Sequence, residues 1–263
     1  MKFNPVKKTL QSGGCVIGSE VSRLRSTDIP RIYANAGFDF VFIDMEHTSF
    51  SPETVADLIQ TARSNDIVPL VRVPEAEYAY VSRVLDAGAQ GIIVPRVNDA
   101  TTVERIVSWT RYPPHGIRGF ACNTAQTDGH PVDASEFVEA ADQSLLVVIQ
   151  IERRQAVENL REMLSIDGVD VACLGLMDLT VDLGVPGQID HPSTQKAVEQ
   201  VLTVSREHNV AAGVISASHD IIAQTVARGV RFVSFATDEF LLQSASEQAV
   251  QQLRATCDGS STS

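Results

Sequence analysis

Three ionisable residues stand where a short apolar segment ends, in the stretch FIDMEH at residues 42–47. Asp44, Glu46 and His47 follow a run of apolar residues, whereas a buried strand usually ends in turn residues such as glycine, asparagine or proline. Carboxylates are ligands for hard metal ions, and histidine can act as a base near neutral pH. The stretch therefore indicates acid–base or metal chemistry at the end of a strand.

Other charged residues occupy similar places. Arg72 interrupts an apolar segment, where an arginine needs an anionic partner, and its planar fork could hold a substrate carboxylate. Glu152 closes a later apolar segment and Asp178 follows the next one, so that these two carboxylates could hold one Mg²⁺ ion. Ordinary interpretations stay open: Asp178 could cap a helix, Glu152 could pair with a neighbouring arginine, and His47 could be a hydrogen-bonded loop residue.

The elements that must position these residues follow an alternating pattern. Eight short apolar segments rich in Val and Ile predict strands at residues 15–21, 38–44, 67–73, 91–95, 145–152, 169–175, 211–215 and 230–236. Helical spacing separates them, at residues 51–65, 76–88, 98–111, 154–164, 191–209, 218–229 and 238–257. Eight alternating units over about 250 residues is the size of a (β/α)8 barrel.

We therefore predict an α/β fold, a single (β/α)8 TIM-barrel domain over residues 1–257 with an extra C-terminal helix, and a disordered tail at 258–263. A doubly wound sheet is the alternative, but no GxGxxG turn follows the first strand. In a barrel the strand ends converge on one face, which would gather Asp44, Glu46, His47, Arg72, Gln150, Glu152, Asp178, Ser234 and Asp238. The long segment 112–143, with Arg118, is expected on the same face.

Composition limits the classes of partner. The chain has 21 basic and 33 acidic residues and a net charge of −12, which argues against nucleic acid or an anionic membrane surface as the partner. No apolar run is long enough to span a membrane, and the N-terminal residues show no signal-peptide pattern, so we expect a cytoplasmic protein.

Six motifs follow one another in order: GFDFVFIDMEH, LVRVP, LDAGAQGIIVPRV, RYPPHGIRG, IQIE and LGLMDLT. Together they resemble the HpcH/HpaI aldolases, the metal-dependent class II pyruvate aldolases, over about residues 5–255. The resemblance implies a barrel of the phosphoenolpyruvate/pyruvate type that cleaves a 4-hydroxy-2-oxo acid reversibly into pyruvate and an aldehyde, through an enolate of pyruvate bound to the metal. It also implies a homo-oligomer, often a hexamer built as a trimer of dimers, with the final helix exchanged between neighbours.

The resemblance assigns roles to individual residues. It implies that Glu152 and Asp178 hold Mg²⁺, Mn²⁺ or Co²⁺, that Arg72 stabilises the enolate oxygen, and that His47 paired with Asp86 is the acid/base. The residues that we assign to substrate binding are Arg72, Asp44, Gln150, Leu176, Met177 and Arg118. A Schiff-base lysine is not evident, because the predicted strand ends contain no lysine.

Two positions depart from the family pattern. Glu20 stands at or near a position where the family often has an aromatic residue, and Leu176 replaces the proline of a G-P-x-D-L motif. These changes leave other functions open. One is a decarboxylase of oxaloacetate-like acids or a bond-forming enzyme such as macrophomate synthase, which would use the same enolate. Another is a barrel that binds a 2-oxo acid without turnover.

Overall fold

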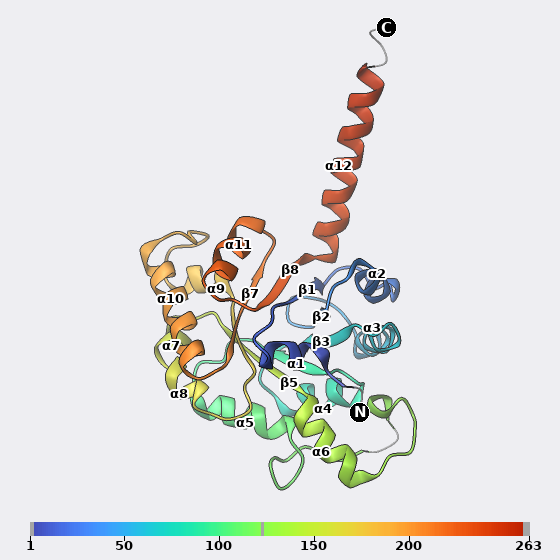
Figure 1. Cartoon of the computed structure of the whole chain (residues 1–263), viewed down its shortest axis with the longest axis vertical. Coiled ribbons are helices and arrows are strands. Elements are labelled where there is room, and N and C mark those ends of the chain that lie inside the picture. Colours follow the sequence, from blue (N-terminus) through green and yellow to red (C-terminus); the bar gives the residue numbers. More distant parts are fainter. Residues whose placement is uncertain (1–2, 122–123, 260–263) are drawn as a thin grey trace.

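The computed structural model describes residues 3–121 and 124–259, and eight parallel strands close into a barrel in sequence order (Figure 1). The strands are β1 (Val16–Val21), β2 (Phe40–Asp44), β3 (Val68–Arg72), β4 (Gly91–Val94), β5 (Leu146–Ile151), β6 (Val171–Leu174), β7 (Ala211–Ser216) and β8 (Phe232–Thr237). Each corresponds to one of the eight apolar segments, so the predicted (β/α)8 barrel is confirmed.

The described helices follow in chain order, and most of them cover the outside of the barrel. They are α1 (Pro5–Gln11), α2 (Asp28–Ala36), α3 (Pro52–Ser64), α4 (Tyr78–Asp86), α5 (Ala100–Thr110), the 3-10 turn η1 (Ala125–Thr127), α6 (Ala134–Ser144), α7 (Arg154–Glu158), α8 (Leu160–Leu164), α9 (Leu176–Asp182), α10 (Pro192–Glu207), α11 (His219–Ala227) and α12 (Asp238–Gly259). The sequence patterns did not identify α1, α2, α6 and α9, and the helix predicted at 154–164 is two short helices that meet at Asn159.

Alternation along the strands decides which side chains face the interior of the barrel. One set of alternate residues packs inside it, including Phe40, Phe42, Leu70, Val148 and Phe232, and the rings of Phe40 and Phe232 stack with centroids 4.5 Å apart. The other set packs against the helices. The inward positions that continue the first set at the carboxyl ends of their strands are Glu20, Asp44, Arg72, Gln150 and Ser234. The apolar interior therefore ends in a polar layer.

The segment 112–143 lies at the other end of the barrel, so its expected place on the carboxyl-end face is wrong. The segment follows helix α5 and leads into β5, and a connection from a helix to the next strand lies at the amino-terminal ends of the strands. It is also not a continuous loop, because it contains η1 and most of α6. Helix α6 begins at Asp133, whose carboxylate accepts hydrogen bonds from the backbone N–H groups of Ser135 and Glu136.

Helix α1 closes the amino-terminal end of the barrel. The side-chain amide of Asn4 donates to the backbone carbonyls of Gln90 and Ser144, which lie just before β4 and β5. The ammonium group of Lys7 is buried and donates to the carbonyl oxygen of Leu145 at 2.7 Å, and it lies 3.0 Å from Asp170 Oδ1. Lys7 therefore ties α1 to the starts of β5 and β6.

We expect Lys7→Met to lower the free energy of unfolding by about 3 kcal/mol, because it leaves the carboxylate of Asp170 partly buried without its cation. Urea unfolding measures the change. The neighbouring Lys8 is exposed on the same helix, so Lys8→Met is the matched control and should change stability by less than about 0.5 kcal/mol. Equal losses in the two variants would contradict a specific role for Lys7.

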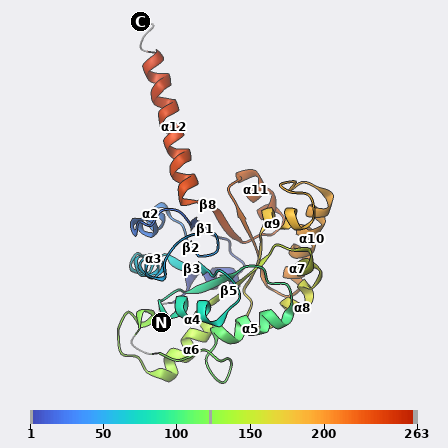
Figure 2. The ribbon, with the colours of Figure 1, turned by 180° about the vertical axis from the view of Figure 1, so that it is seen from behind.

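Helix α12 projects from the barrel, and the opposite view shows no other element of the chain against its outer half (Figures 1 and 2). Its exposed apolar side chains are Phe240, Leu242, Val250 and Leu253, and Leu253 is 65% exposed. The helix continues to Gly259, so two residues of the predicted disordered tail are helical, and residues 260–263 lie outside the described chain. Across the described residues, no helix combines the length and the apolar character that a membrane crossing requires.

Candidate active site

Arg72 is the centre of the polar layer. It ends β3 in register with Asp44 on β2, and its guanidinium lies over the ring of Phe42, 5.0 Å from the ring centroid. Its Nε donates to Asp44 Oδ1 at 2.6 Å, its Nη1 lies 3.5 Å from Gln150 Oε1, and its Nη2 lies 3.8 Å from Glu20 Oε1. The buried arginine therefore has an anionic partner and joins residues from three other strands.

The electrostatics of this group keep Arg72 and Asp44 charged. Burial opposes the charge of Arg72, but the hydrogen bond and charge of Asp44, with Glu20 and Glu46, raise its pKa above the usual value. Burial likewise opposes the charge of Asp44, but Arg72 and the backbone N–H groups of Glu46 and His47 hold its pKa below the usual range. Asp44 also shapes the loop after β2, because its carboxylate accepts those N–H groups at 2.9 and 3.1 Å.

Glu46, for which the sequence indicated no role, lies between Arg96, Arg72 and His47. One carboxylate oxygen lies 3.0 Å from Arg96 Nη1, and the other, Oε2, lies 3.4 Å from Arg72 Nε and 3.7 Å from His47 Nε2. Glu46 Oε2 is buried and has no hydrogen-bond partner. Burial raises the pKa of Glu46 despite the positive charges of Arg72 and Arg96. The side chain of His47 is 62% exposed, and its ring is open to a ligand at the mouth of the barrel.

Glu152 is held in place by groups from neighbouring strands. Its Oε1 accepts the backbone N–H of Arg96 at 2.6 Å, and its Oε2 accepts a hydrogen bond from the side-chain amide of Gln150. A Cβ atom at Gly175 would lie 2.8 Å from Glu152 Oε2, so only glycine fits beside the carboxylate. Burial, aided by the charges of Glu46 and Asp178, raises the pKa of Glu152 to about 7.

Arg96 is a site residue that the sequence patterns did not identify. It follows β4 and adopts a φ of 54°, in the left-handed region that a long side chain rarely occupies. This conformation directs its N–H at Glu152, while its side chain reaches Glu46. The place of Arg96 directly after the fourth apolar segment could have indicated a site residue, as the place of Arg72 did. Its left-handed backbone conformation could not be predicted from the sequence.

Asp178 lies beside Glu152 without capping the helix that contains it. The cap position of α9 is Gly175, and Asp178 is exposed in the first turn. Both carboxylates line one pocket of about 220 Å³, together with Glu46, His47, Arg96, Arg153, Val181 and Asp182. Of the two neighbours assigned to the substrate, Leu176 is buried in the core and Met177 is exposed at the surface.

The residues present fit a divalent cation. Among residues 3–121 and 124–259, no group of three or more His, Cys, Asp or Glu side chains is arranged as a metal cluster, and Glu152 and Asp178 are the two carboxylates that would hold a cation. Three carboxylate side chains, Glu20, Asp44 and Glu46, are at most 11% exposed and lie within 3.8 Å of one buried cation, Arg72, and Glu152 is a fourth buried carboxylate in the site. This excess of negative charge and the unpartnered oxygen of Glu46 favour a bound cation.

Asp86 and Arg118 lie away from this group. Asp86 ends α4, which runs back from the carboxyl end of β3 to the amino end of β4, so within one chain it lies at the opposite end of the barrel from His47. Arg118 is buried in the segment 112–143, where its guanidinium donates to Asp86 Oδ1 at 2.9 Å and lies over the ring of Tyr112. One chain therefore does not bring together His47 and Asp86, and it does not place Arg118 among the strand ends.

Ser234 on β8 and Asp238, the first residue of α12, have different surroundings. The carboxylate of Asp238 accepts backbone N–H groups of Ser22, Arg23 and Leu24, the last at 2.7 Å, and so fixes the loop after β1 rather than facing a ligand. Ser234 is fully buried, and its hydroxyl oxygen has no hydrogen-bond partner.

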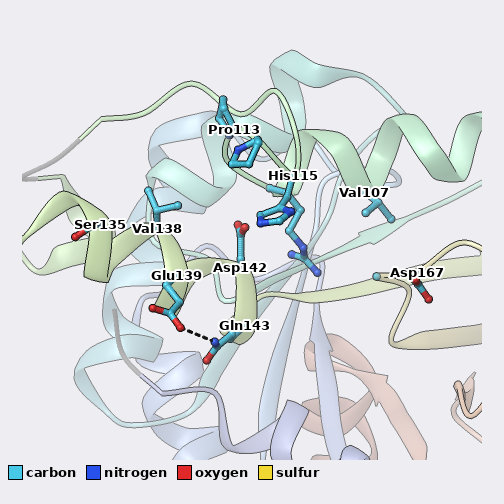
Figure 3. A pocket seen from close by; sticks show the side chains of 12 residues that line it. Val107, Pro113, His115, Ser135, Val138, Glu139, Asp142, Gln143 and Asp167 are labelled. Atoms are coloured by element: carbon cyan, nitrogen blue, oxygen red, sulfur yellow. Dashed lines mark hydrogen bonds between the residues drawn. The ribbon is translucent and has the colours of Figure 1, made fainter.

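A larger pocket, of about 820 Å³, lies between α5, α6 and the loop before β6 (Figure 3). The side chains of His115, Asp142, Glu139 and Gln143 line it, and none of the predicted site residues does. It lies toward the amino-terminal ends of the strands, where barrel enzymes do not place their chemistry. The smaller strand-end pocket is therefore the candidate active site.

Glu20 gives a prediction on pH. Burial, with the charge of Asp44, raises its pKa to about 7 from an ordinary value of 4.5, against the opposing charge of Arg72. The stability that a protonated Glu20 contributes is complete below pH 4.5 and is lost as the pH rises through about 7. In EDTA at pH 8, the free energy of unfolding of Glu20→Gln should therefore exceed that of the wild type by up to ~3 kcal/mol, and at pH 5.5 the difference should be much smaller. Urea unfolding measures both differences.

The control for this prediction is Glu53→Gln, on the exposed surface of α3. Its effect on stability should be the same at pH 5.5 and pH 8. A Glu20→Gln effect that did not change with pH would mean that Glu20 stays ionised over this range in the folded protein.

Comparison with known proteins places this geometry in one family. The model of the HpcH/HpaI aldolase/citrate lyase family matches residues 22–245. A 2-keto-3-deoxy-L-rhamnonate aldolase of Escherichia coli O17:K52:H18 is 31% identical over 259 residues, covering 97% of this chain and 95% of that protein. A 4-hydroxy-2-oxo-heptane-1,7-dioate aldolase of Shigella sonnei is 33% identical over 244 residues, covering 93% and 92%. A crystal structure of an HpcH/HpaI aldolase from Desulfitobacterium hafniense superposes with a TM-score of 0.89 at 32% identity, covering 94% of this chain and 96% of the other.

Proposed function

The chain belongs to the HpcH/HpaI aldolase/citrate lyase family, and we propose that it is a metal-dependent aldolase that cleaves a 4-hydroxy-2-oxo acid into pyruvate and an aldehyde. The observation that carries this proposal is the buried Arg72, which contacts the carboxylates of Asp44 and Glu20 and the side-chain amide of Gln150, from three other strands. Such a group is suited to charge that develops on a substrate oxygen during a reaction.

The residues of the site divide the reaction between them. Glu152 and Asp178 would hold a divalent cation, which when bound would act as a Lewis acid on the 2-oxo group. Arg72 donates hydrogen bonds to the 2-oxo oxygen and stabilises the negative charge that grows there as the carbon–carbon bond breaks. His47 at the mouth removes the proton of the 4-hydroxyl group.

The lysines of the chain support this division. Lys7 is buried at the opposite end of the barrel, Lys8 is exposed on α1, and Lys196 lies on α10, so none of the described lysines reaches the strand ends to form a Schiff base. The choice among Mg²⁺, Mn²⁺ and Co²⁺ and the cytoplasmic location stay predictions.

We also propose that the active protein is an oligomer. The resemblance to the family implies that this oligomer is a hexamer. Asp86 can reach His47 only from a second copy of the chain, and both side chains are accessible, at 38% and 62% exposure. The exposed apolar face of α12 offers a surface for that association.

Leu253→Glu should lower the mass measured by light scattering and reduce turnover, whereas Arg254→Glu on the same exposed turn should have a smaller effect. A monomeric wild-type protein with full activity would rule out a shared site.

The proposed function is tested by release of pyruvate from a panel of 4-hydroxy-2-oxo acids and oxaloacetate, coupled to lactate dehydrogenase. The assay is run with untreated enzyme, after EDTA, and after Mg²⁺, Mn²⁺ or Co²⁺ is restored. Cleavage that EDTA abolishes and metal restores supports the proposal. Release from oxaloacetate alone would favour a decarboxylase, and no release from any substrate despite metal binding would reject both.

A further inference from the structure

The pocket of about 820 Å³ between α5, α6 and the loop before β6, which we call the amino-end pocket, has no part in the proposed mechanism. One face of α6 lines it, with residues at helical spacing: Ser135, Val138, Glu139 and Asp142. Further lining residues are Val107 on α5 and Arg111 directly after that helix. Figure 3 shows the side chains of Asp142 and His115 directed into this space. The amino-end pocket therefore has charges of both signs on its walls.

Arg111 is the buried cation of the amino-end pocket, with only 9% of the residue exposed. Its guanidinium donates one long hydrogen bond, to Thr110 Oγ1 at 3.3 Å, and within residues 3–121 and 124–259 it has no ion pair. Burial lowers the pKa of Arg111, although the charges of Asp170 and Asp142 oppose this effect. Because buried arginines are almost always paired with anions, Arg111 lacks the partner that its burial requires.

The carboxylates that attract Arg111 do not supply this partner. Asp170 is paired with Lys7, whose Nζ lies 3.0 Å from Asp170 Oδ1 and donates to Asp170 Oδ2 at 3.1 Å. Asp142 accepts the backbone N–H of Tyr112 with Oδ1 at 3.2 Å, and within the described chain its other oxygen makes no hydrogen bond. The amino-end pocket therefore offers an incoming anion a cation to bind, and it offers a carboxylate with an oxygen to spare.

The other charges of the amino-end pocket disfavour a simple anion. Glu139, Asp142 and Asp167 line it, so three carboxylates share the pocket with one buried guanidinium. A polyanion such as phosphate would be attracted by Arg111 but repelled by these carboxylates. A ligand that carries one carboxylate and one ammonium group satisfies both signs. In an α-amino acid the two groups are attached to the same carbon, which suits a cation and a carboxylate that line the same pocket.

Apolar side chains complete the amino-end pocket. They are Val107, Pro113, Pro114 and Val138. Val138 lies one turn before Asp142 on α6, and Val107 lies one turn before Arg111. Each charged group therefore has an apolar neighbour on the same helical face, and an aliphatic side chain of a ligand would be removed from water between them.

We propose that the amino-end pocket binds a free α-amino acid with an apolar side chain. The carboxylate of the ligand pairs with Arg111, its ammonium group pairs with Asp142, and its side chain packs against Val107 and Val138. The inference does not depend on the proposed function. Because the pocket lies at the end of the barrel opposite the strand-end site, the amino acid is a bound ligand and not a substrate of the reaction.

The test is isothermal titration calorimetry of the full-length, EDTA-treated protein with L-leucine, L-valine and L-phenylalanine. We expect saturable binding of at least one of them, with one molecule per chain. The matched ligands for leucine are 4-methylpentanoate, which lacks the ammonium group, 3-methylbutylamine, which lacks the carboxylate, and glycine, which lacks the side chain. Each should bind at least roughly tenfold more weakly than leucine, since each loses a charge-assisted hydrogen bond or the apolar contact.

Two substitutions separate the two charged contacts. Arg111→Met should weaken binding of the amino acid by roughly a hundredfold, and the unfolding temperature of the ligand-free variant should be equal or higher, because a buried cation without a partner is removed. Asp142→Asn should weaken binding of leucine by roughly tenfold and leave binding of 4-methylpentanoate unchanged. The matched controls are Arg105→Met and Glu136→Gln, on exposed parts of α5 and α6, which should bind as the wild type does.

The inference is overturned if none of the three amino acids binds, or if Arg111→Met binds them as the wild type does. Equal binding of leucine, 4-methylpentanoate and inorganic phosphate would make the pocket a general anion site and would also overturn it. If Arg111→Met unfolded at a markedly lower temperature than the wild type, Asp142→Asn would decide: loss of affinity for leucine but not for 4-methylpentanoate supports the amino acid, and equal affinity for leucine in Asp142→Asn and the wild type rejects it.

Discussion

Arg72→Ala is expected to lower kcat by roughly a hundred- to a thousandfold, the usual effect of removing one donor from a site where negative charge develops. The guanidinium is fixed in advance by Asp44 at 2.6 Å and by the ring of Phe42 beneath it, so it does not need to reorganise when the reaction begins. Arg72→Lys keeps the charge but loses the fork, and we expect it to recover only part of the rate. Steady-state kinetics of pyruvate release measure both variants.

The variant also leaves Asp44 buried without its cation, so a loss of stability has to be separated from a loss of chemistry. Arg63→Ala is the matched control, because Arg63 is equally buried and pairs with Asp128 at 2.9 Å, but at the amino-terminal end of the barrel. Arg63→Ala should lower the unfolding temperature and leave kcat unchanged. If Arg72→Ala kept near wild-type turnover while folded, or if Arg63→Ala lost as much turnover, Arg72 would have no part in catalysis.

The fold was predictable because its strands are buried on both sides. A strand in a barrel has one face toward the interior and one toward the helices, so segments such as 145–149 are continuously apolar and stand out from the amphipathic helices. Other features obscured three of the missed helices. Helix α2 contains Pro30, α9 has only 7 residues, and α6 lies in a segment whose glycines and prolines indicate turns.

The site was predictable only in part. Residues placed by strand ends, such as Arg72, Gln150 and Glu152, come together because parallel strands bring their carboxyl ends to one face. Within one chain Arg118 lies away from the strand ends because the segment that contains it follows a helix, and the alternation that predicts the barrel places such a segment at the other end. Asp86 was assigned by resemblance alone, and a partner on another copy of the chain cannot be found from the order of elements within one chain.

The backbone also positions groups in ways that no residue pattern reveals. The N–H of Arg96 reaches Glu152 because Arg96 adopts a left-handed conformation, and Gly175 is required because Glu152 lies where a Cβ atom would be. Glu46 has little meaning in sequence, but it lies between Arg72 and Arg96 in space. Each of these contacts concerns Glu46 or Glu152, so the part of the site that sequence described least well is the one around the predicted cation.

Glu152→Gln is expected to weaken Mn²⁺ binding by roughly a hundredfold or more, because it removes the charge of one of two carboxylate ligands. Mutation of a residue that only hydrogen-bonds to a metal ligand already lowers metal affinity by roughly ten- to a hundredfold. Isothermal titration calorimetry with the EDTA-treated protein measures this without reference to turnover. The substitution keeps the shape of the side chain next to Gly175, so the pocket should stay folded. Catalysis should be lost with the metal, and excess Mn²⁺ should restore little of it.

Asp182→Asn is the matched control, because Asp182 lines the same pocket but uses its carboxylate to accept the backbone N–H of Arg154 at 2.7 Å. It should change the net charge by the same amount and leave Mn²⁺ affinity within about threefold, since an exposed charge at longer range is largely screened. If both variants weakened binding equally, the cation would be held by the general negative potential of the pocket. Unchanged affinity in Glu152→Gln would remove Glu152 from the ligand set, and the unpartnered oxygen of Glu46 would then be the next ligand to test.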